Sequence, residues 1–198
     1  MGTTENIRLL QQAIACFDDA QAYRQLFLLF QPSLLQFAIS ITHSKQLSEE
    51  IVSDVFIKIW QKRQQLDKID NLPYYLFTAV KNHAINEFHK QKKNPSLAIN
   101  EMAVEFRSIY HDPEQKLISE EMIRRIQISI SQLPPRCQLI FKLIKEDGLK
   151  YKEVAELLHL SVKTIENQMT LAIKKIGAAL DPEAHHTTRH LVDFLSRN

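Results

Sequence analysis

Glycine is scarce in this chain, with only three residues in 198. Sheets and tight hairpins need turns in which a residue adopts a positive φ, and glycine does so at least cost. Apolar residues recur instead at steps of one, three and four, as they do where one face of a helix is buried. The sequence therefore predicts an all-α protein. One such apolar stripe contains Leu26, Phe27, Phe30, Leu34, Phe37 and Ile41.

The helical pattern falls into two blocks. The first covers residues 1–93 and the second covers residues 114–180, which follow a helix start at Asp112-Pro113. Residues 94–113 between them are weakly patterned and contain two prolines, as is typical of a linker. Residues 181–198 form a tail to which the pattern assigns no role. We therefore expect two small helical domains joined by a flexible linker.

Some helix boundaries can be predicted from single residues. Ser48 is followed by two glutamates, and this combination is typical of an N-cap and an acidic first turn. Leu72-Pro73 predicts a second start, because proline suits the first turn of a helix. Pro32 interrupts the first apolar stripe and is expected to start or kink a helix.

The cysteines and the terminal segment indicate a cytoplasmic protein. Cys16 and Cys137 lie far apart in apolar runs, so we expect reduced thiols in the core. No apolar run approaches the ~20 residues that cross a bilayer. The N-terminal residues lack the basic and apolar segments of a signal peptide.

Sequence signs of catalysis are absent. We find no glycine-rich phosphate loop and no nucleophile motif. Three histidines in the tail have no acidic or cysteine partner at ligand spacing, and at most they would bind metal weakly. The sequence therefore predicts that the protein is not an enzyme and has no cofactor and no metal site. These histidines are His185, His186 and His190.

Residues 151–176, YKEVAELLHLSVKTIENQMTLAIKKI, have the arrangement of a helix-turn-helix. Ala155 is small enough for a close helix crossing. His159 falls at the turn, where the backbone often becomes left-handed, and histidine tolerates that conformation better than most residues. Ser161 is expected to cap the second helix. The apolar residues that hold the two helices together are Val154, Leu158, Leu160 and Ile165.

The second of these helices carries polar side chains opposite its apolar face. We expect Ile165, Met169, Ile173 and Ile176 to face inward. Asparagine and glutamine can bond adenine in the major groove, and lysine can reach guanine or phosphate. The formal net charge is only +2, so nucleic-acid binding depends on where the charges lie. The expected outward residues are Lys163, Thr164, Asn167, Gln168, Thr170, Lys174 and Lys175.

Glu166 does not fit this face simply, because a carboxylate repels phosphate. It either accepts a hydrogen bond from a cytosine amino group or lies off the groove. The alternative for the whole segment is an ordinary helical hairpin with a solvated face.

The helix expected after Leu72 has a basic end, with Lys81, Lys90, Lys92 and Lys93 set against the single acid Glu87. Tyr74, Tyr75 and Phe77 lie just upstream, and aromatic rings beside lysines suit unstacked single-stranded bases. The alternative places Tyr75 and Leu76 in the core, with the lysines complementing the helix dipole.

Two long segments resemble a known family. SEEIVSDVFIKIWQKR followed by LPYYLFTAVKNHAINEFHKQKK resembles region 2 of sigma-70-type RNA polymerase sigma factors. LPPRCQLIFKLIKEDGLKYKEVAELLHLSVKTIENQMTLAIKKIGAAL is similar to region 4. The regions occur in this order with no room for region 3 between them, which is typical of the extracytoplasmic-function (ECF) group. The resemblance covers about residues 22–180.

The resemblance implies that region 2 binds core RNA polymerase at the clamp helices of β′. The residues that match this motif are Glu50, Asp54, Lys58 and Trp60. Ser53 stands where the family pattern has glutamine, so one contact is expected to be weaker. The following helix and the loop before it would bind the melted −10 element through Tyr74, Asn82, Asn86, Lys90, Lys92 and Lys93.

Region 4, by the same resemblance, would bind the duplex −35 element and the flap of the β subunit. The −35 residues would be Lys163, Thr164, Glu166, Asn167, Gln168, Thr170, Lys174 and Lys175. An anti-sigma factor is a further implied partner, and no small-molecule substrate is. The rival interpretation is a stand-alone activator of the LuxR kind, whose first block would sense a signal or dimerise and which would bind paired half-sites unaided.

Overall fold

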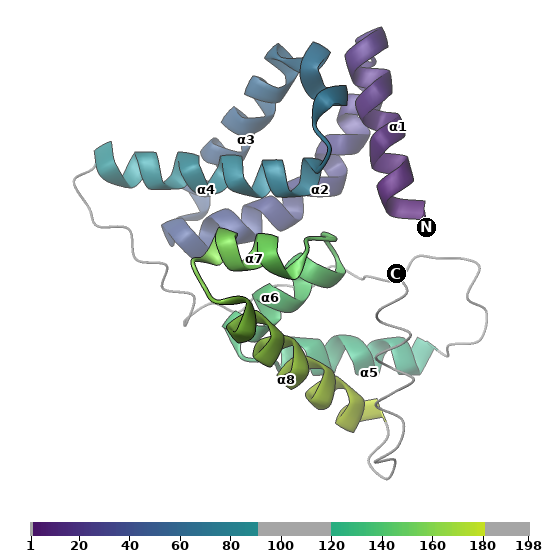
Figure 1. Cartoon of the computed structure of the whole chain (residues 1–198), viewed down its shortest axis with the longest axis vertical. Coiled ribbons are helices and arrows are strands. Elements are labelled where there is room, and N and C mark those ends of the chain that lie inside the picture. The colour runs from purple at the N-terminus through teal and green to yellow at the C-terminus, as the bar shows by residue number, and fades with distance from the viewer. Residues whose placement is uncertain (1, 91–119, 181–198) are drawn as a thin grey trace. The chain divides into compact units, whose positions relative to one another are not determined.

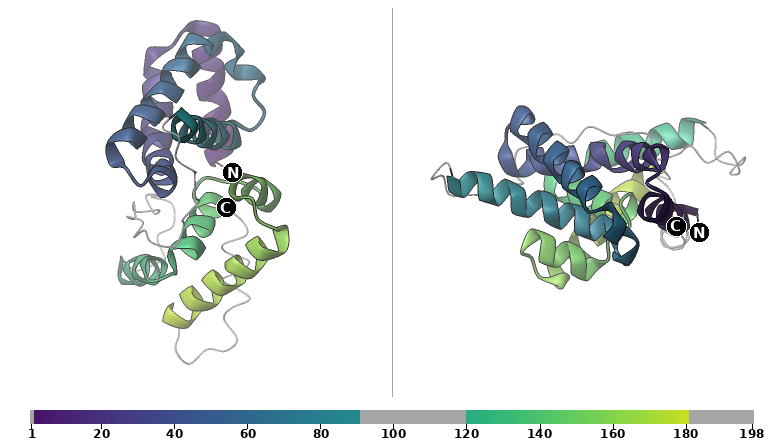
Figure 2. Two further views of the ribbon diagram at one scale, coloured as in Figure 1. Left: turned by 90° about the vertical axis from the view of Figure 1, so that its left-hand side faces the viewer. Right: turned by 90° about the horizontal axis from the view of Figure 1, so that it is seen from above.

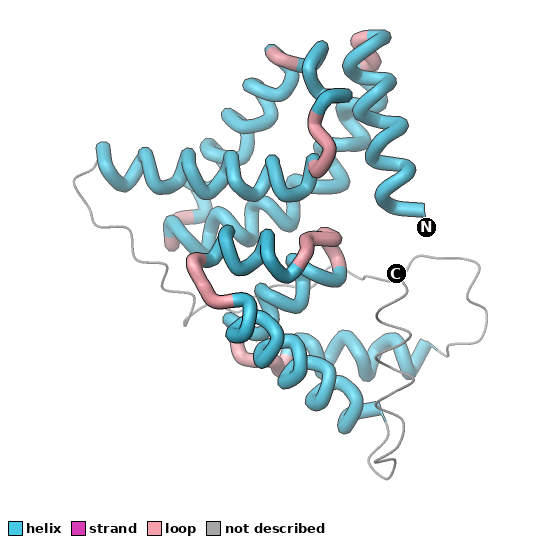
Figure 3. Tube along the Cα trace, viewed as in Figure 1, coloured by secondary structure: helices cyan, strands magenta, loops and turns pink. Residues whose placement is uncertain are grey.

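The computed structural model describes residues 2–90 and 120–180, which form two compact units within residues 1–98 and 99–198. Among these residues every regular element is a helix, and Figure 3 shows only short loops between the helices. The prediction of an all-α protein with two helical domains is confirmed. The predicted linker (94–113), the predicted tail (181–198) and the helix start at Asp112 lie outside the described residues.

Unit 1 contains α1 (Gly2–Phe17), α2 (Ala20–Thr42), α3 (Lys45–Gln61), the 3₁₀ helix η1 (Arg63–Lys68) and α4 (Leu72–Lys90). α2 packs against α1, α3 and α4, and α1 packs against η1 (Figures 1 and 2). The predicted stripe on α2 is its core face, because Leu26, Leu34 and Phe37 are almost fully buried. Burying each such side chain contributes about 1.5–3 kcal/mol.

α2 is long and apolar enough, by length and composition, to cross a membrane. It has 23 residues and contains an 18-residue window of mean hydropathy 1.3. The sequence prediction of no such run is wrong by this measure, because a window average tolerates Gln31, Ser33 and Gln36. Pro32 lies inside α2 and does not end it. The buried face of α2 is covered by its neighbouring helices, as expected for the core helix of a folded domain.

The start of α3 corrects another prediction. Ser44, not Ser48, is the N-cap, and its side chain accepts a hydrogen bond from the Leu47 amide at 3.3 Å. Ser48 lies within the first turns of α3 and is buried, with its hydroxyl 2.7 Å from the Thr42 hydroxyl. Glu49 and Glu50 therefore lie in the second turn, and no acidic residue occupies the first. α4 begins at Leu72 as predicted, with Pro73 in its first turn.

Unit 2 contains α5 (Glu120–Ser131), α6 (Pro135–Lys145), α7 (Tyr151–Leu158) and α8 (Val162–Leu180). α8 packs against α5, α6 and α7, around a core that includes Ile130, Ile140 and Phe141. The paired prolines after Leu133 separate α5 from α6, as the sequence predicts. Gly148 follows α6 with a φ of 71°, a conformation that glycine adopts without strain.

Candidate functional site

The turn between α7 and α8 has the geometry predicted for a helix-turn-helix. His159 ends α7 with φ 53° and ψ 46°, which is the left-handed region. The amide of Leu160 donates to the Ala155 carbonyl at 2.9 Å, so the turn closes on the end of α7. Val154, Leu158 and Ile165 are buried and hold the two helices together. α8 is therefore set at a fixed angle to α7.

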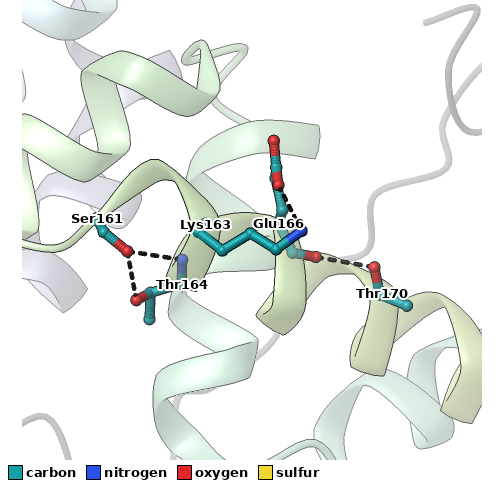
Figure 4. A network of polar contacts seen from close by, with 5 residues as sticks. All are labelled: Ser161, Lys163, Thr164, Glu166 and Thr170. Atoms are coloured by element: carbon teal, nitrogen blue, oxygen red, sulfur yellow. Dashed lines mark hydrogen bonds and ion pairs between the residues drawn. The ribbon is translucent and has the colours of Figure 1, made fainter.

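Ser161 caps α8 as predicted (Figure 4). Its hydroxyl oxygen accepts a hydrogen bond from the Thr164 amide at 3.0 Å. The Thr164 hydroxyl lies 2.8 Å from the same oxygen, so this side chain belongs to the cap. The Thr164 amide also donates to the Ser161 carbonyl at 2.9 Å, so Ser161 holds the first turn of α8 through both its hydroxyl and its backbone oxygen.

The buried face of α8 differs from the prediction at one position. Ile165, Met169 and Ile176 are buried as expected, but the third buried residue is Ala172. Ile173 lies half-buried at the margin. A spacing of four, three and four keeps the buried residues on one face of a 3.6-residue helix, and residue 173 is turned about 100° from residue 172.

The opposite face of α8 presents the predicted polar stripe. Lys163, Asn167, Thr170 and Lys174 recur at steps of four, three and four and are all exposed. Lys175 is also exposed, whereas Thr164 and Gln168 are half-buried on the flank. The stripe begins in the first turn of the helix, which is the part of a recognition helix that meets base edges.

Several of these side chains already have partners. Lys163 Nζ donates to Glu166 Oε2 at 3.3 Å, and the Thr170 hydroxyl donates to the Glu166 carbonyl at 2.9 Å (Figure 4). Among the described residues, the side chains of Asn167 and Lys174 make no hydrogen bond or ion pair. These two are therefore the most available polar groups of the stripe.

The buried thiol of Cys137 forms a hydrogen bond to the backbone of α8. Cys137 on α6 is fully buried, and its Sγ donates to the Gln168 carbonyl at 3.2 Å. Burial raises the pKa of the Cys137 thiol, and the charge of Lys175 partly opposes this. Cys137 is a core thiol as predicted. Cys16 is not, because it lies on the exposed face of α1.

Unit 1 has a shallow hollow of about 200 Å³ between α3 and α4. Apolar Val55, Ile59 and Ala79 line it together with polar and aromatic side chains. His83 lies there with Nε2 at 3.6 Å from Asp54 Oδ2 and 3.8 Å from Glu87 Oε1. The hollow brings together residues that the sequence assigned to two different interfaces. Its remaining lining residues are Lys58, Tyr75, Asn82 and Asn86.

The predicted polymerase-binding residues of α3 divide into two kinds. Glu50, Asp54 and Lys58 are exposed. Trp60 is half-buried, with its ring 4.8 Å from that of Tyr23 and the Arg63 guanidinium 4.7 Å above it. This stacking makes Trp60 part of the packing at the end of α3.

The predicted basic end of α4 is only partly described. Lys81 is 8% exposed and burial lowers its pKa, so it does not belong to an exposed basic patch. Lys90 lies at the end of α4 without a described side chain, and Lys92 and Lys93 lie outside the described residues.

The aromatic residues at the start of α4 are placed differently from one another. The alternative that puts Tyr75 and Leu76 in the core is right for Leu76, which is fully buried, and wrong for Tyr75, which is 44% exposed. Phe77 is also fully buried. Tyr74 is half-buried, and its amide donates to Asn71 Oδ1 at 3.1 Å. Tyr75 is therefore the aromatic ring that this region offers to a partner.

Sequence reasoning missed Gln11. This buried side chain of α1 donates from Nε2 to the Leu66 carbonyl at 2.8 Å and to the Ile69 carbonyl at 2.9 Å. α1 thereby holds the end of η1 and the loop before Leu72. The signal was present, because Gln11 lies on the same helical face as the buried Ile7 and Ile14.

Two family models match the chain. The model described as Sigma-70 region 2 matches residues 26–94, and the model described as Sigma-70, region 4 matches residues 123–176. The first match begins within α2 and includes α3 and α4, and the second runs from within α5 to within α8. α1 lies before the first match.

Curated relatives agree with these matches. The chain is 22% identical to the RNA polymerase sigma-H factor of Pseudomonas aeruginosa, over 83% of this chain and 89% of that protein. It is 24% identical to the ECF RNA polymerase sigma factor EcfG of Rhodopseudomonas palustris, over 75% and 80%. It is 21% identical to the ECF RNA polymerase sigma factor SigW of Bacillus subtilis, over 76% and 84%.

Solved structures include two with similar chains. One is the structure of CnrH in complex with the cytosolic domain of CnrY, with 20% identity, a TM-score of 0.46 and coverage of 90% of this chain and 99% of that chain. The other is the sigma factor RpoE in complex with the anti-sigma factor NepR from Bartonella quintana, with 22% identity, a TM-score of 0.43 and coverage of 83% and 100%.

Proposed function

Because the chain belongs to the sigma-70 family of RNA polymerase sigma factors and to its ECF group, we propose that it binds core RNA polymerase and directs promoter-specific initiation. In this role unit 2 binds the duplex −35 element and unit 1 binds the melted −10 element. The protein acts through binding, not as an enzyme, and it works in the cytoplasm, where the polymerase is.

The observation that carries this proposal is the exposed stripe on the capped helix α8. Asn167 has the donor and acceptor that bond adenine N7 and N6 in the major groove. Lys174 and Lys175 are exposed further along the helix and suit phosphates. The Thr164 hydroxyl is bonded to the cap residue Ser161 and the Thr170 hydroxyl to the Glu166 carbonyl, so we assign both threonines a supporting role in holding the helix.

Support for −10 binding comes from the hollow between α3 and α4. Its apolar floor, the exposed ring of Tyr75 and the amides of Asn82 and Asn86 suit the faces and edges of unstacked bases. Opening duplex DNA costs about 1.4 kcal/mol per base-pair step. Stacking of a captured base contributes ~1–3 kcal/mol, which offsets this cost.

Polymerase binding is assigned to the exposed face of α3. Glu50 and Asp54 present carboxylates there, and Lys58 lies between this face and the hollow. The polymerase surface and the −10 surface therefore adjoin, and Lys58 can contribute to both.

Region 4 would also contact the β flap. Binding of two domains to one polymerase raises the effective concentration of each over its own affinity.

Membership of the ECF group also suggests an anti-sigma factor as a partner that holds the protein inactive. Because the formal net charge of the chain is only +2, we expect it to bind promoter DNA weakly in the absence of polymerase.

Gel filtration of the purified chain with bacterial core RNA polymerase tests the proposal. We expect a stable complex of one chain with one core enzyme. A chain that fails to join the core enzyme, and that instead forms a dimer bound to paired duplex half-sites, would establish the stand-alone activator.

A further inference from the structure

One acidic residue lies on the helix that we assign to −35 DNA. Glu166 follows Lys163 by three positions and precedes Thr170 by four, so it lies along the edge of the exposed stripe. Residues in the first two turns of a recognition helix approach the DNA most closely. A negative charge at this position would therefore repel the phosphates that line the groove.

The structure shows what surrounds the Glu166 carboxylate. Its Oε2 lies 3.3 Å from Lys163 Nζ, and the two side chains are 48% and 77% exposed (Figure 4). On α7, burial raises the pKa of Tyr151, and the negative charge of Glu166 raises it further. Glu166 thus forms an ion pair with a lysine of its own helix, and its charge also acts on a tyrosine of the neighbouring helix.

We propose that Glu166 is an electrostatic brake on DNA binding by unit 2, in which its carboxylate neutralises Lys163 and repels the phosphate backbone. The inference rests on the proposed assignment of α8 to duplex DNA. It excludes the alternative in which Glu166 accepts a hydrogen bond from a cytosine base. The brake makes unit 2 bind DNA weakly until polymerase holds the protein at a promoter.

The physical basis is the number of phosphates that the helix neutralises. Affinity for duplex DNA depends on salt through counterion release, with a slope of about −0.9 for each phosphate neutralised. Lys163 and Glu166 together have no net charge, so this end of the helix adds nothing to the slope. Exposed ion pairs exchange readily, but the carboxylate remains beside the DNA whether or not the pair is formed.

Glu166 also has a simpler structural role, because a carboxylate near a helix N-terminus stabilises the helix dipole. That role alone predicts a small loss of helix stability in Glu166→Gln and no gain in DNA affinity. The two roles are therefore distinguished by the sign of the change in binding.

The experiment measures binding of the full chain to a fluorescein-labelled duplex of random sequence by anisotropy, across a NaCl titration at low ionic strength. We expect Glu166→Gln to bind more tightly and to have a salt slope steeper by about 0.9. The double variant Lys163→Ala, Glu166→Gln restores zero net charge and is expected to return to the wild-type slope. Circular dichroism verifies that each variant keeps its helices.

A matched control is available in unit 1. Lys45 and Glu49 form an ion pair on α3 at 3.9 Å, with side chains 76% and 52% exposed. Glu49→Gln makes the same chemical change and the same change in net charge as Glu166→Gln. We expect it to leave the salt slope for duplex DNA unchanged, because the pair lies outside α8.

Lys174→Ala separates failure of the brake from failure of the DNA assignment. If Lys174→Ala reduces the slope but Glu166→Gln does not increase it, the brake is wrong and α8 still binds DNA. If neither variant changes the slope, α8 is not the DNA-binding helix and both proposals are wrong. Weaker binding by Glu166→Gln would show that the carboxylate makes a favourable contact, which also overturns the brake.

Discussion

Replacing Gln11 by methionine should destabilise unit 1 without creating a cavity. The two side chains have nearly the same length and volume, so the change removes hydrogen bonds and little packing. Gln11 donates to the carbonyls of Leu66 and Ile69 at 2.8 and 2.9 Å. Methionine cannot donate to either oxygen.

The magnitude follows from what remains bonded to these carbonyls. The Leu66 carbonyl also accepts from the Ile69 amide at 3.2 Å, and the Ile69 carbonyl accepts from Arg8 Nη1 at 3.4 Å. Neither oxygen loses every partner, so the full penalty for an unsatisfied buried group does not apply. Two hydrogen bonds at about 0.5–1.5 kcal/mol each give a loss of about 1–3 kcal/mol in the free energy of unfolding of unit 1.

Trp60 is the only tryptophan in the chain and lies in α3, so its fluorescence reports the unfolding of unit 1. Urea titration followed at this residue gives the free energy of unfolding for wild type and for Gln11→Met. Gln12→Met is the matched control, because Gln12 is exposed and should change stability by less than about 0.5 kcal/mol. Equal stability of the two variants would refute the claim that Gln11 holds the loop before α4.

Three further predictions concern the proposed interfaces. Ser161→Ala should lower the stability of α8 by about 1 kcal/mol, measured as faster hydrogen exchange of the amides in its first turn. Ser161→Asn should keep the slow exchange of these amides, because asparagine also caps helices. Equal exchange rates in the two variants would contradict the capping role of Ser161. Asn167→Ala should relax base preference in the −35 element by ~1–3 kcal/mol in transcription from single-base promoter variants, and an unchanged preference would remove Asn167 from base recognition. Asp54→Arg should weaken binding to core polymerase while circular dichroism stays the same, and unchanged co-elution would place α3 outside that interface.

The helix-turn-helix could be predicted from sequence because its determinants are local. Ser161 accepts from the amide of Thr164, three residues further along the chain. His159 lies in the turn between α7 and α8, where the backbone enters the left-handed region. The periodicity of α2 likewise indicated which of its residues are buried. Such features depend on neighbours within a few residues, which a sequence contains explicitly.

Other features could not be predicted, because they depend on tertiary contacts that choose between two local possibilities. Ser44 and Ser48 are both good caps by type, and the close contact between the Ser48 and Thr42 hydroxyls places Ser48 inside the helix. Cys16 is exposed because the other face of α1 covers η1. Neither outcome could be derived from periodicity alone, since each depends on which face the tertiary structure covers.

The candidate site shows the same division. The exposed polar stripe of α8 could be predicted from helical spacing. The hydrogen bond from Lys163 to Glu166 could not, because it depends on the conformations of the two side chains. In unit 1 the sequence separated Lys58 from Asn82 because they belong to different helices. The structure brings them to one hollow.

The most direct test of the central claim is run-off transcription from a library of genomic fragments by core RNA polymerase with and without the purified chain. We expect new transcripts that appear only when the chain is present and that share a −35 and a −10 sequence at fixed spacing. Transcripts that do not depend on the chain, together with salt-sensitive duplex binding by the chain alone, would contradict the sigma-factor assignment.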